Sequence, residues 1–157
     1  MPETPDQPPA PSPRPTPSPS PTAKELTWLT NNPQTPAAAR RLLLDFLPRI
    51  RGGERFADKG QLLVSELVTN ALVHATRRDQ LIRLGLEADM DADRLWISVE
   101  DPSDKVPQQQ HKNPDEESGR GLLLVDALSE EWGWGPREGI GKQVWCSCAP
   151  DPVVCRS

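Results

Sequence analysis

Two polar side chains, Glu66 and Asn70, interrupt a segment that is otherwise apolar. They are four residues apart, so a helix would place them one turn apart on the same face. A carboxylate and an amide in that arrangement can supply a base and an oxygen ligand for Mg²⁺ side by side. Polar groups of this kind are costly to bury unless they face a cavity, although a solvated helix edge gives the same spacing.

A second group of residues with chemical potential is Gly119-Arg120-Gly121-Leu122, which follows a long polar stretch and opens an apolar run. Glycines let the backbone approach an anion closely, and the N-terminus of a helix favours negative charge. Arg120 could add a contact to a phosphate group. A glycine-rich entry to a helix is common, so this pattern alone does not define a site.

The third candidate is Asp101, which ends a predicted strand and is followed by Pro102-Ser103. A carboxylate at a strand end can accept a hydrogen bond from an exocyclic amine. An ordinary Asp-Pro-Ser turn is the alternative explanation.

The elements that must position these residues are predicted from periodicity and turn residues. The range 55–75 has apolar residues over more than half of a helix circumference, which predicts a buried helix. Alternation of apolar and polar residues predicts strands, and a helix that starts near Thr35 should end or kink at Pro48. The predicted strands are 24–30, 80–87, 94–100, one that begins at Trp132, and 142–147.

Composition separates a tail from a folded part. The chain has 157 residues and 19 prolines, and ten of those prolines fall within 1–22. That segment has almost no apolar side chains to bury, so we expect a disordered, partly polyproline-II tail. We expect one folded domain over 23–150 and a short C-terminal tail over 151–157.

Charge and cysteine content restrict the class of protein. The net charge of -5 disfavours nucleic acid as a direct partner. The sequence has neither a signal peptide nor an apolar run long enough to span a membrane, so no membrane association is expected. The three cysteines Cys146, Cys148 and Cys155 indicate reduced thiols and a cytoplasmic protein.

The order of the motifs resembles the GHKL ATPase family. ELVTNALVHA resembles its N box, VEDPSDKVP its first glycine box and ESGRGLLLVDAL its second, followed by WGW and GK-x-VW. The resemblance covers about 28–147 and is closest to the branch that contains the anti-sigma-factor serine/threonine kinases. It implies an α/β (α+β) two-layer sandwich, in which helices cover one face of a mixed, mainly antiparallel sheet.

The resemblance also implies roles for individual residues. Asn70 would bind Mg²⁺, Glu66 would activate the attacking hydroxyl or water, and Asp101 would accept the amine of adenine. Gly119, Arg120, Gly121 and Leu122 would form the phosphate-binding entry to a helix, and 104–118 would form a mobile lid. One departure is that no glycine follows Asp101, whereas the family usually has Asp-x-Gly-x-Gly there.

These features favour an ATP- and Mg²⁺-dependent kinase that phosphorylates a small protein antagonist and binds a sigma factor or that antagonist. The missing glycines favour the alternative, a partner-switching module that holds ATP without phosphotransfer. A third interpretation is the detached catalytic domain of a histidine kinase. Two features disfavour it: the sequence predicts no separate helix that could carry a phosphoacceptor histidine, and His74 lies on the predicted nucleotide-binding helix itself. The resemblance also allows a homodimer.

Overall fold

The computed structural model describes residues 10–15, 22–74, 80–103, 121–137 and 141–152. Its secondary structure follows the predicted order of elements. The helices are α1 (Thr35–Phe46), α2 (Ala57–His74) and α3 (Gly121–Leu128), with 3-10 turns at Leu47–Arg49 and Gly53–Phe56. The strands are β1 (Ala23–Leu29), β2 (Ile82–Asp89), β3 (Arg94–Asp101), β4 (Glu131–Pro136) and β5 (Lys142–Cys148).

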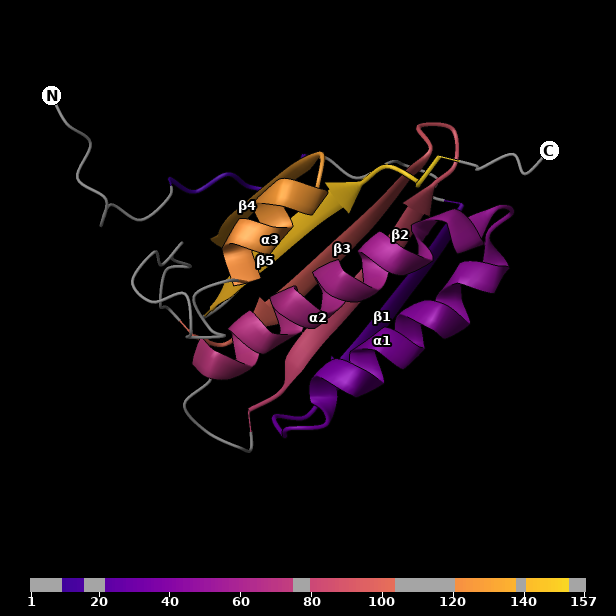
Figure 1. Cartoon of the computed structure of the whole chain (residues 1–157). Helices are drawn as coiled ribbons and strands as arrows, with labels where there is room; N and C mark the ends of the chain where they lie inside the picture. The colour runs from indigo at the N-terminus through magenta and orange to yellow at the C-terminus, as the bar shows by residue number, and fades with distance from the viewer. Residues whose placement is uncertain (1–9, 16–21, 75–79, 104–120, 138–140, 153–157) are drawn as a thin grey trace, which may run out of the picture.

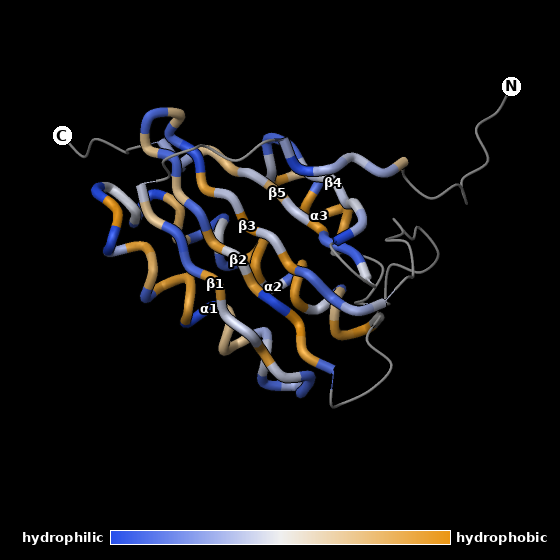
Figure 2. The backbone as a smooth tube through the Cα atoms, turned by 180° about the vertical axis from the view of Figure 1, so that it is seen from behind, coloured by the Kyte–Doolittle hydropathy of each residue, from blue (hydrophilic) through white to orange (hydrophobic). Residues whose placement is uncertain are grey.

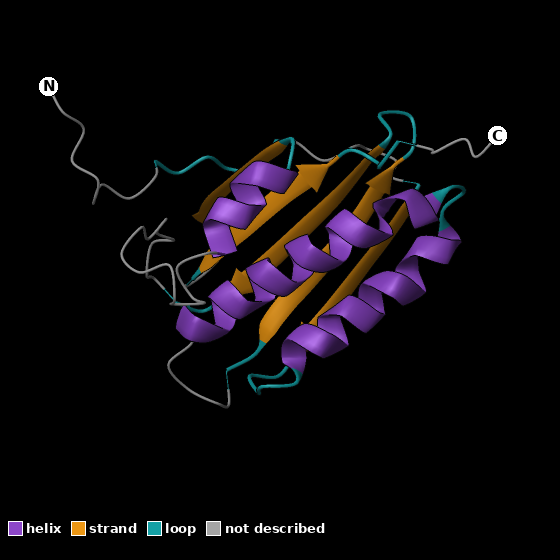
Figure 3. Ribbon diagram, viewed as in Figure 1, coloured by secondary structure: helices purple, strands orange, loops and turns teal. Residues whose placement is uncertain are grey.

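The five strands form one sheet in the order β1-β2-β3-β5-β4. All three α-helices lie on the same face of this sheet, with α2 between α1 and α3 (Figures 1 and 3). The expected two-layer α+β arrangement is therefore confirmed. The sheet was expected to be mixed and mainly antiparallel, and each of the four pairings between the described strands is antiparallel.

The core lies between α2 and the middle of the sheet. Alternate residues of a strand point to opposite faces, so one set of side chains from each strand meets the helices. The side chains that α2 contributes are each at most 2 % exposed: Leu63, Val64, Leu67, Val68 and Ala71. Burial of each such side chain is worth roughly 1.5–3 kcal/mol, so α2 is held firmly against the strands that carry the candidate site.

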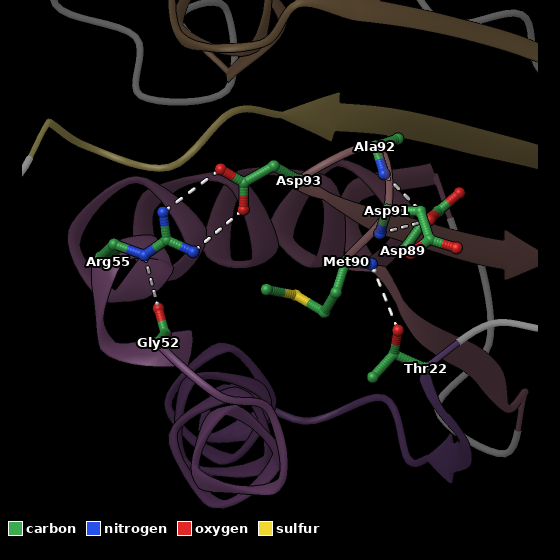
Figure 4. Close-up of polar contacts among 8 residues, drawn as sticks. All are labelled: Thr22, Gly52, Arg55, Asp89, Met90, Asp91, Ala92 and Asp93. Atoms are coloured by element: carbon green, nitrogen blue, oxygen red, sulfur yellow. Dashed lines mark hydrogen bonds and ion pairs between the residues drawn. The ribbon is translucent and has the colours of Figure 1, made fainter.

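The β2–β3 hairpin is anchored at its turn (Figure 4), which lies at the opposite end of β3 from Asp101. Asp93 has a positive φ of 53°, and its carboxylate accepts hydrogen bonds from Arg55 at 2.9 and 3.2 Å. Arg55 also donates to the carbonyl of Gly52 at 2.9 Å, and Thr22 Oγ1 accepts from the Met90 amide at 3.2 Å. The Arg55 bonds tie the hairpin to the turn before α2, and the Thr22 bond ties it to the start of β1.

Part of the N-terminal stretch lies against the sheet. The amide of Ser12 donates to the carbonyl of Trp134 in β4 at 2.7 Å, and the amide of Thr22 donates to Ala88 in β2 at 2.9 Å. Figure 1 shows residues 10–15, in indigo, reaching the sheet at β4. These six residues therefore have contacts that the composition of 1–22 does not indicate, because backbone bonds replace the missing apolar side chains.

At the other end of the chain, Asp151 also contacts the domain. Its amide donates to the carbonyl of Arg55 at 2.9 Å, and its carboxylate lies 3.4 Å from Lys59 Nζ. Among the described residues, no helix is both long and apolar enough to cross a membrane.

Candidate functional site

The predicted site residues come from elements that meet at one end of the sheet. The end of α2, the end of β3, the start of α3 and the start of β5 lie together there (Figure 1). Asp101, the last residue of β3, is paired in register with Lys142, the first residue of β5. The fold therefore gathers the candidates from four separate parts of the chain.

Asp101 lies on the helix-covered face, because it continues the alternation of the buried residues Ile97 and Val99. It is 0 % exposed. Its Oδ1 accepts hydrogen bonds from the Ser103 amide at 2.8 Å and from Lys142 Nζ at 3.1 Å. Burial raises the pKa of Asp101, and the nearby charge of Lys142 opposes that shift.

The second oxygen of Asp101 is only partly satisfied. Oδ2 lies 3.1 Å from Lys142 Nζ, which is an ion-pair contact. It is buried and accepts no hydrogen bond within the described residues. A buried carboxylate oxygen in this condition is suited to an added N–H donor, which is what an exocyclic amine would bring.

Asn70 is half-buried on α2, and helix geometry gives its direction. Arg40 of α1 donates to Ser65 at 2.8 Å, so Ser65 marks the α1 side of α2. Asn70 is five residues later, about 140° further round the helix, next to the buried Leu63 and Leu67. Its Nδ2 is buried with no hydrogen-bond partner within the described residues. An orphaned amide donor is costly unless an acceptor occupies the site.

Glu66 lies one turn before Asn70 and is also half-buried. It borders an open surface groove of about 450 Å³ that is lined by Arg40, Asp58, Gln61, Leu62 and Ser65. Glu66 is thus reachable from the surface, whereas Asp101 is sealed from it. The structure places both residues as predicted, on α2 and at the end of β3, but Glu66 lies in the more open surroundings.

The predicted phosphate-binding entry is described only from Gly121, the first residue of α3. Leu122 is 3 % exposed, so its side chain packs in the interior at the start of α3, and its predicted place in the phosphate-binding entry stays a prediction. Gly119 and Arg120, the predicted lid over 104–118 and the side chain of His74 lie outside the described residues. Their predicted roles stay predictions.

Sequence reasoning missed Lys142 as a site residue. Its position on β5 alternates with the buried Val144 and Cys146, which was the available signal, and its side chain is 2 % exposed. The preceding Gly141 has φ 125°, and a Cβ there would lie 2.1 Å from the carbonyl oxygen of Asp101. Glycine is therefore required for β5 to approach the end of β3 and bring Lys142 to Asp101.

The donor set of the site can be tested against a metal ion. The described residues include no cluster of three or more His, Cys, Asp or Glu side chains. Cys146 and Cys148 are buried in the core, where burial raises the pKa of Cys148 to about 12 and raises the pKa of Cys146 well above its usual range. One amide oxygen from Asn70 fits Mg²⁺, which takes few protein ligands and completes its shell with phosphates and water.

Comparison with known proteins gives a match to a family model. Residues 29–147 match the family model described as "Histidine kinase-like ATPase domain". The match runs from the end of β1 into β5 and includes Glu66, Asn70 and Asp101. No curated protein matches the chain.

Proposed function

We propose that this chain, which belongs to the histidine kinase-like ATPase family, is a cytoplasmic ATP-binding regulatory protein of the anti-sigma-factor serine/threonine kinase type. Its substrate would be a hydroxyl group on a small protein antagonist. The observation that supports this most is the buried Asp101 at the end of β3, whose Oδ2 accepts no hydrogen bond within the described residues.

Asp101 would select the base of the nucleotide. Its Oδ2 would accept a hydrogen bond from the exocyclic amine of adenine, while Lys142 and the Ser103 amide hold the carboxylate in place through Oδ1. A guanine base carries a carbonyl at the corresponding ring position, which cannot donate. A site whose buried acceptor is left unpaired discriminates strongly against such an analogue.

Asn70 would act on the phosphates. Its carbonyl oxygen would hold Mg²⁺, and its orphaned Nδ2 would donate to a phosphate oxygen. The metal supplies charge neutralisation for the transferring phosphoryl group. The N-terminus of α3, with Gly119, Arg120 and Gly121, would supply backbone N–H groups and a positive charge to the same phosphates.

Glu66 would act on the attacking group. Its carboxylate would orient the substrate hydroxyl and take its proton as the oxygen attacks the γ-phosphorus, and ADP would leave. The surface groove beside Glu66 makes it reachable by a residue on another protein. A protein substrate needs that accessibility, because its serine or threonine must approach from outside.

A second function is favoured by the state of Asp101. The carboxylate is fully buried and already paired with Lys142, and no glycine follows it to loosen the chain. Both features suit a protein that holds ATP and exchanges protein partners without transferring phosphate. In that case Glu66 would have no chemical role.

Phosphotransfer separates the two functions. Single-turnover assays with labelled ATP and candidate antagonists, captured from the native cell with and without ATP, would measure it. Glu66→Gln keeps the size and hydrogen bonding of the side chain, so it should bind ATP normally and lose transfer by on the order of 10² or more. Asn70→Ala should lose both ATP binding and phosphotransfer.

Transfer by Glu66→Gln at the wild-type rate would contradict the assignment of Glu66 as the base. Absence of transfer by the wild type to every captured partner would favour the ATP-holding function.

A further inference from the structure

The face of the sheet opposite the helices carries side chains that an open, solvated face does not need. Trp96 of β3 and Trp145 of β5 point to this back face, with ring centroids 5.7 Å apart. Trp145 is only 3 % exposed, although all the described helices lie on the other face of the sheet (Figure 3). In Figure 2, which shows the molecule from behind, the N-terminal segment approaches this side at β4. We call residues 10–15 the strap.

The strap is bound to the back face through its backbone. The amide of Ser12 donates to the carbonyl of Trp134 at 2.7 Å, and Trp145 Nε1 donates to the carbonyl of Ser12 at 2.7 Å. A tryptophan N–H on the carbonyl of a residue that precedes proline suits an extended proline-rich segment, whose carbonyls have no partners of their own. The contacts therefore recognise a backbone conformation.

One glycine of β4 makes room for the strap. A Cβ on Gly133 would lie 2.5 Å from the carbonyl oxygen of Ser12, whereas a Cβ on Gly135 would meet the Cα of Pro13 at 3.4 Å, an ordinary contact distance. Only glycine at position 133 lets Ser12 come close enough for its bonds to Trp134 and Trp145. The back face of β4 is thus shaped to receive a chain.

The side chain of Arg14 makes the contact specific for arginine. Its guanidinium forms an ion pair with Glu87 of β2 and lies 4.9 Å from the ring centroid of Trp96. The Arg14 side chain is 16 % exposed and that of Glu87 is 5 % exposed. An arginine that is stacked on an aromatic ring and paired with a buried carboxylate is a specific contact, for which lysine is a poor substitute.

We propose that the back face is a peptide-binding surface for extended segments with a Ser-Pro-Arg core, and that the strap is its intramolecular ligand. In this surface, Trp145 binds the peptide backbone, and Gly133 lets the peptide approach closely. Trp96 and Glu87 bind the arginine side chain. A partner protein that carries a proline-rich, arginine-containing segment would compete with the strap for this surface. The surface lies on the opposite side of the sheet from Asp101, so this proposal does not depend on ATP binding.

Competition by a peptide in trans tests the proposal on the full-length chain. The probe is a fluorescent peptide with the sequence of residues 8–17, PPAPSPRPTP, measured by anisotropy. The Arg14→Ala variant weakens its own strap and should bind the probe about tenfold more tightly than the wild type, because a cis ligand acts at a high effective concentration. Arg41→Ala, which removes an exposed arginine on α1, is the matched control and should bind the probe as the wild type does.

Two further variants show whether the probe occupies the strap's own position. Adding Glu87→Gln or Trp145→Phe to Arg14→Ala should weaken probe binding by about tenfold, and a probe with glutamate in place of its arginine should not bind. Circular dichroism would verify that each variant is folded. The proposal is overturned if the Arg14→Ala variant, while folded, does not bind the probe at about 1 mM. It is equally overturned if binding does not depend on Glu87 and Trp145.

Discussion

On each face of the sheet, a buried carboxylate is paired with a cation. On the helix-covered face, Asp101 is paired with Lys142, which lies directly opposite it on the neighbouring strand. On the back face, Glu87 is paired with Arg14, which is 73 positions away in sequence and lies on the strap. The chemistry is alike, but the first partner is fixed by sheet register and the second by a segment that could detach.

This difference determines what happens when the partner is lost. If Lys142 loses its charge, the strands stay paired and Asp101 stays out of water, so its charge is uncompensated. If Arg14 is removed, the strap can leave and water can reach Glu87. A fixed pair is thus suited to holding a site residue in place, whereas a detachable pair is suited to exchange of ligands.

The largest expected effect comes from Lys142→Met, which removes the charge while keeping much of the side chain. It should lower the free energy of unfolding by about 3–5 kcal/mol at pH 7, because it leaves a buried unpaired carboxylate. Urea denaturation would measure the change. The double variant Asp101→Leu/Lys142→Met should recover most of the loss, and failure to do so would mean that Lys142 acts through packing.

The same variant should show a distinct pH dependence. The pKa of Asp101 is already raised in the folded protein, and removal of Lys142 takes away the charge that opposes the shift. A raised folded-state pKa means that the folded state binds more protons, so the stability of the variant should increase as pH falls from 7 towards the usual carboxyl range near 4. The difference in free energy of unfolding between the variant and the wild type should become smaller over that pH interval. A constant difference would contradict the ion-pair explanation.

A smaller effect is expected when the detachable pair is broken. Arg14→Ala should lower the free energy of unfolding by about 1 kcal/mol. In a domain of this size, that loss corresponds to a fall of about 4 °C in melting temperature. Deletion of 1–15 should have a similar effect, because it removes the same contacts. Thermal unfolding followed by circular dichroism would measure both. A loss as large as that of Lys142→Met would show that Glu87 stays sealed without the strap.

The smallest effect is expected at the far edge of the back face. Trp28 of β1 is 57 % exposed, and its ring lies under the guanidinium of Arg83 at 5.5 Å. Trp28→Ser should therefore change the free energy of unfolding by at most about 0.5–1 kcal/mol, the value of an exposed cation–π contact. It should leave binding of the Ser-Pro-Arg peptide unchanged. Weaker peptide binding in this variant would mean that the binding surface extends to β1.

Much of the fold could be predicted because its signals are local. Alternation located β2, β3 and β5 within two residues of their observed bounds, and Pro48 marked the end of α1. The position of Asp101 at a strand end was likewise local information. Its pairing with Lys142 was not, because strand register across 41 positions depends on tertiary packing.

The strap could not be predicted for a related reason. The composition of 1–22 shows only that this segment has few apolar side chains to bury. It does not show that a folded surface can bind the segment through backbone hydrogen bonds. The available signal lay elsewhere, in Trp96, Trp145 and Glu87, which occupy the face of the sheet away from the core. Two neighbouring tryptophan rings on a face that the described helices leave open form an apolar patch of the kind that marks an interaction site.

Isothermal titration of the full-length protein with ATP in the presence of Mg²⁺ would test both nucleotide binding and base selection by Asp101. We expect saturable binding that weakens when the metal is chelated, strong loss in Asn70→Ala and in folded Asp101→Asn, and little affinity for GTP. Wild-type protein that is folded and does not bind ATP at about 1 mM, the upper end of usual substrate affinities, would contradict this expectation. So would equal binding of ATP and GTP, because Asp101 would then not read the base.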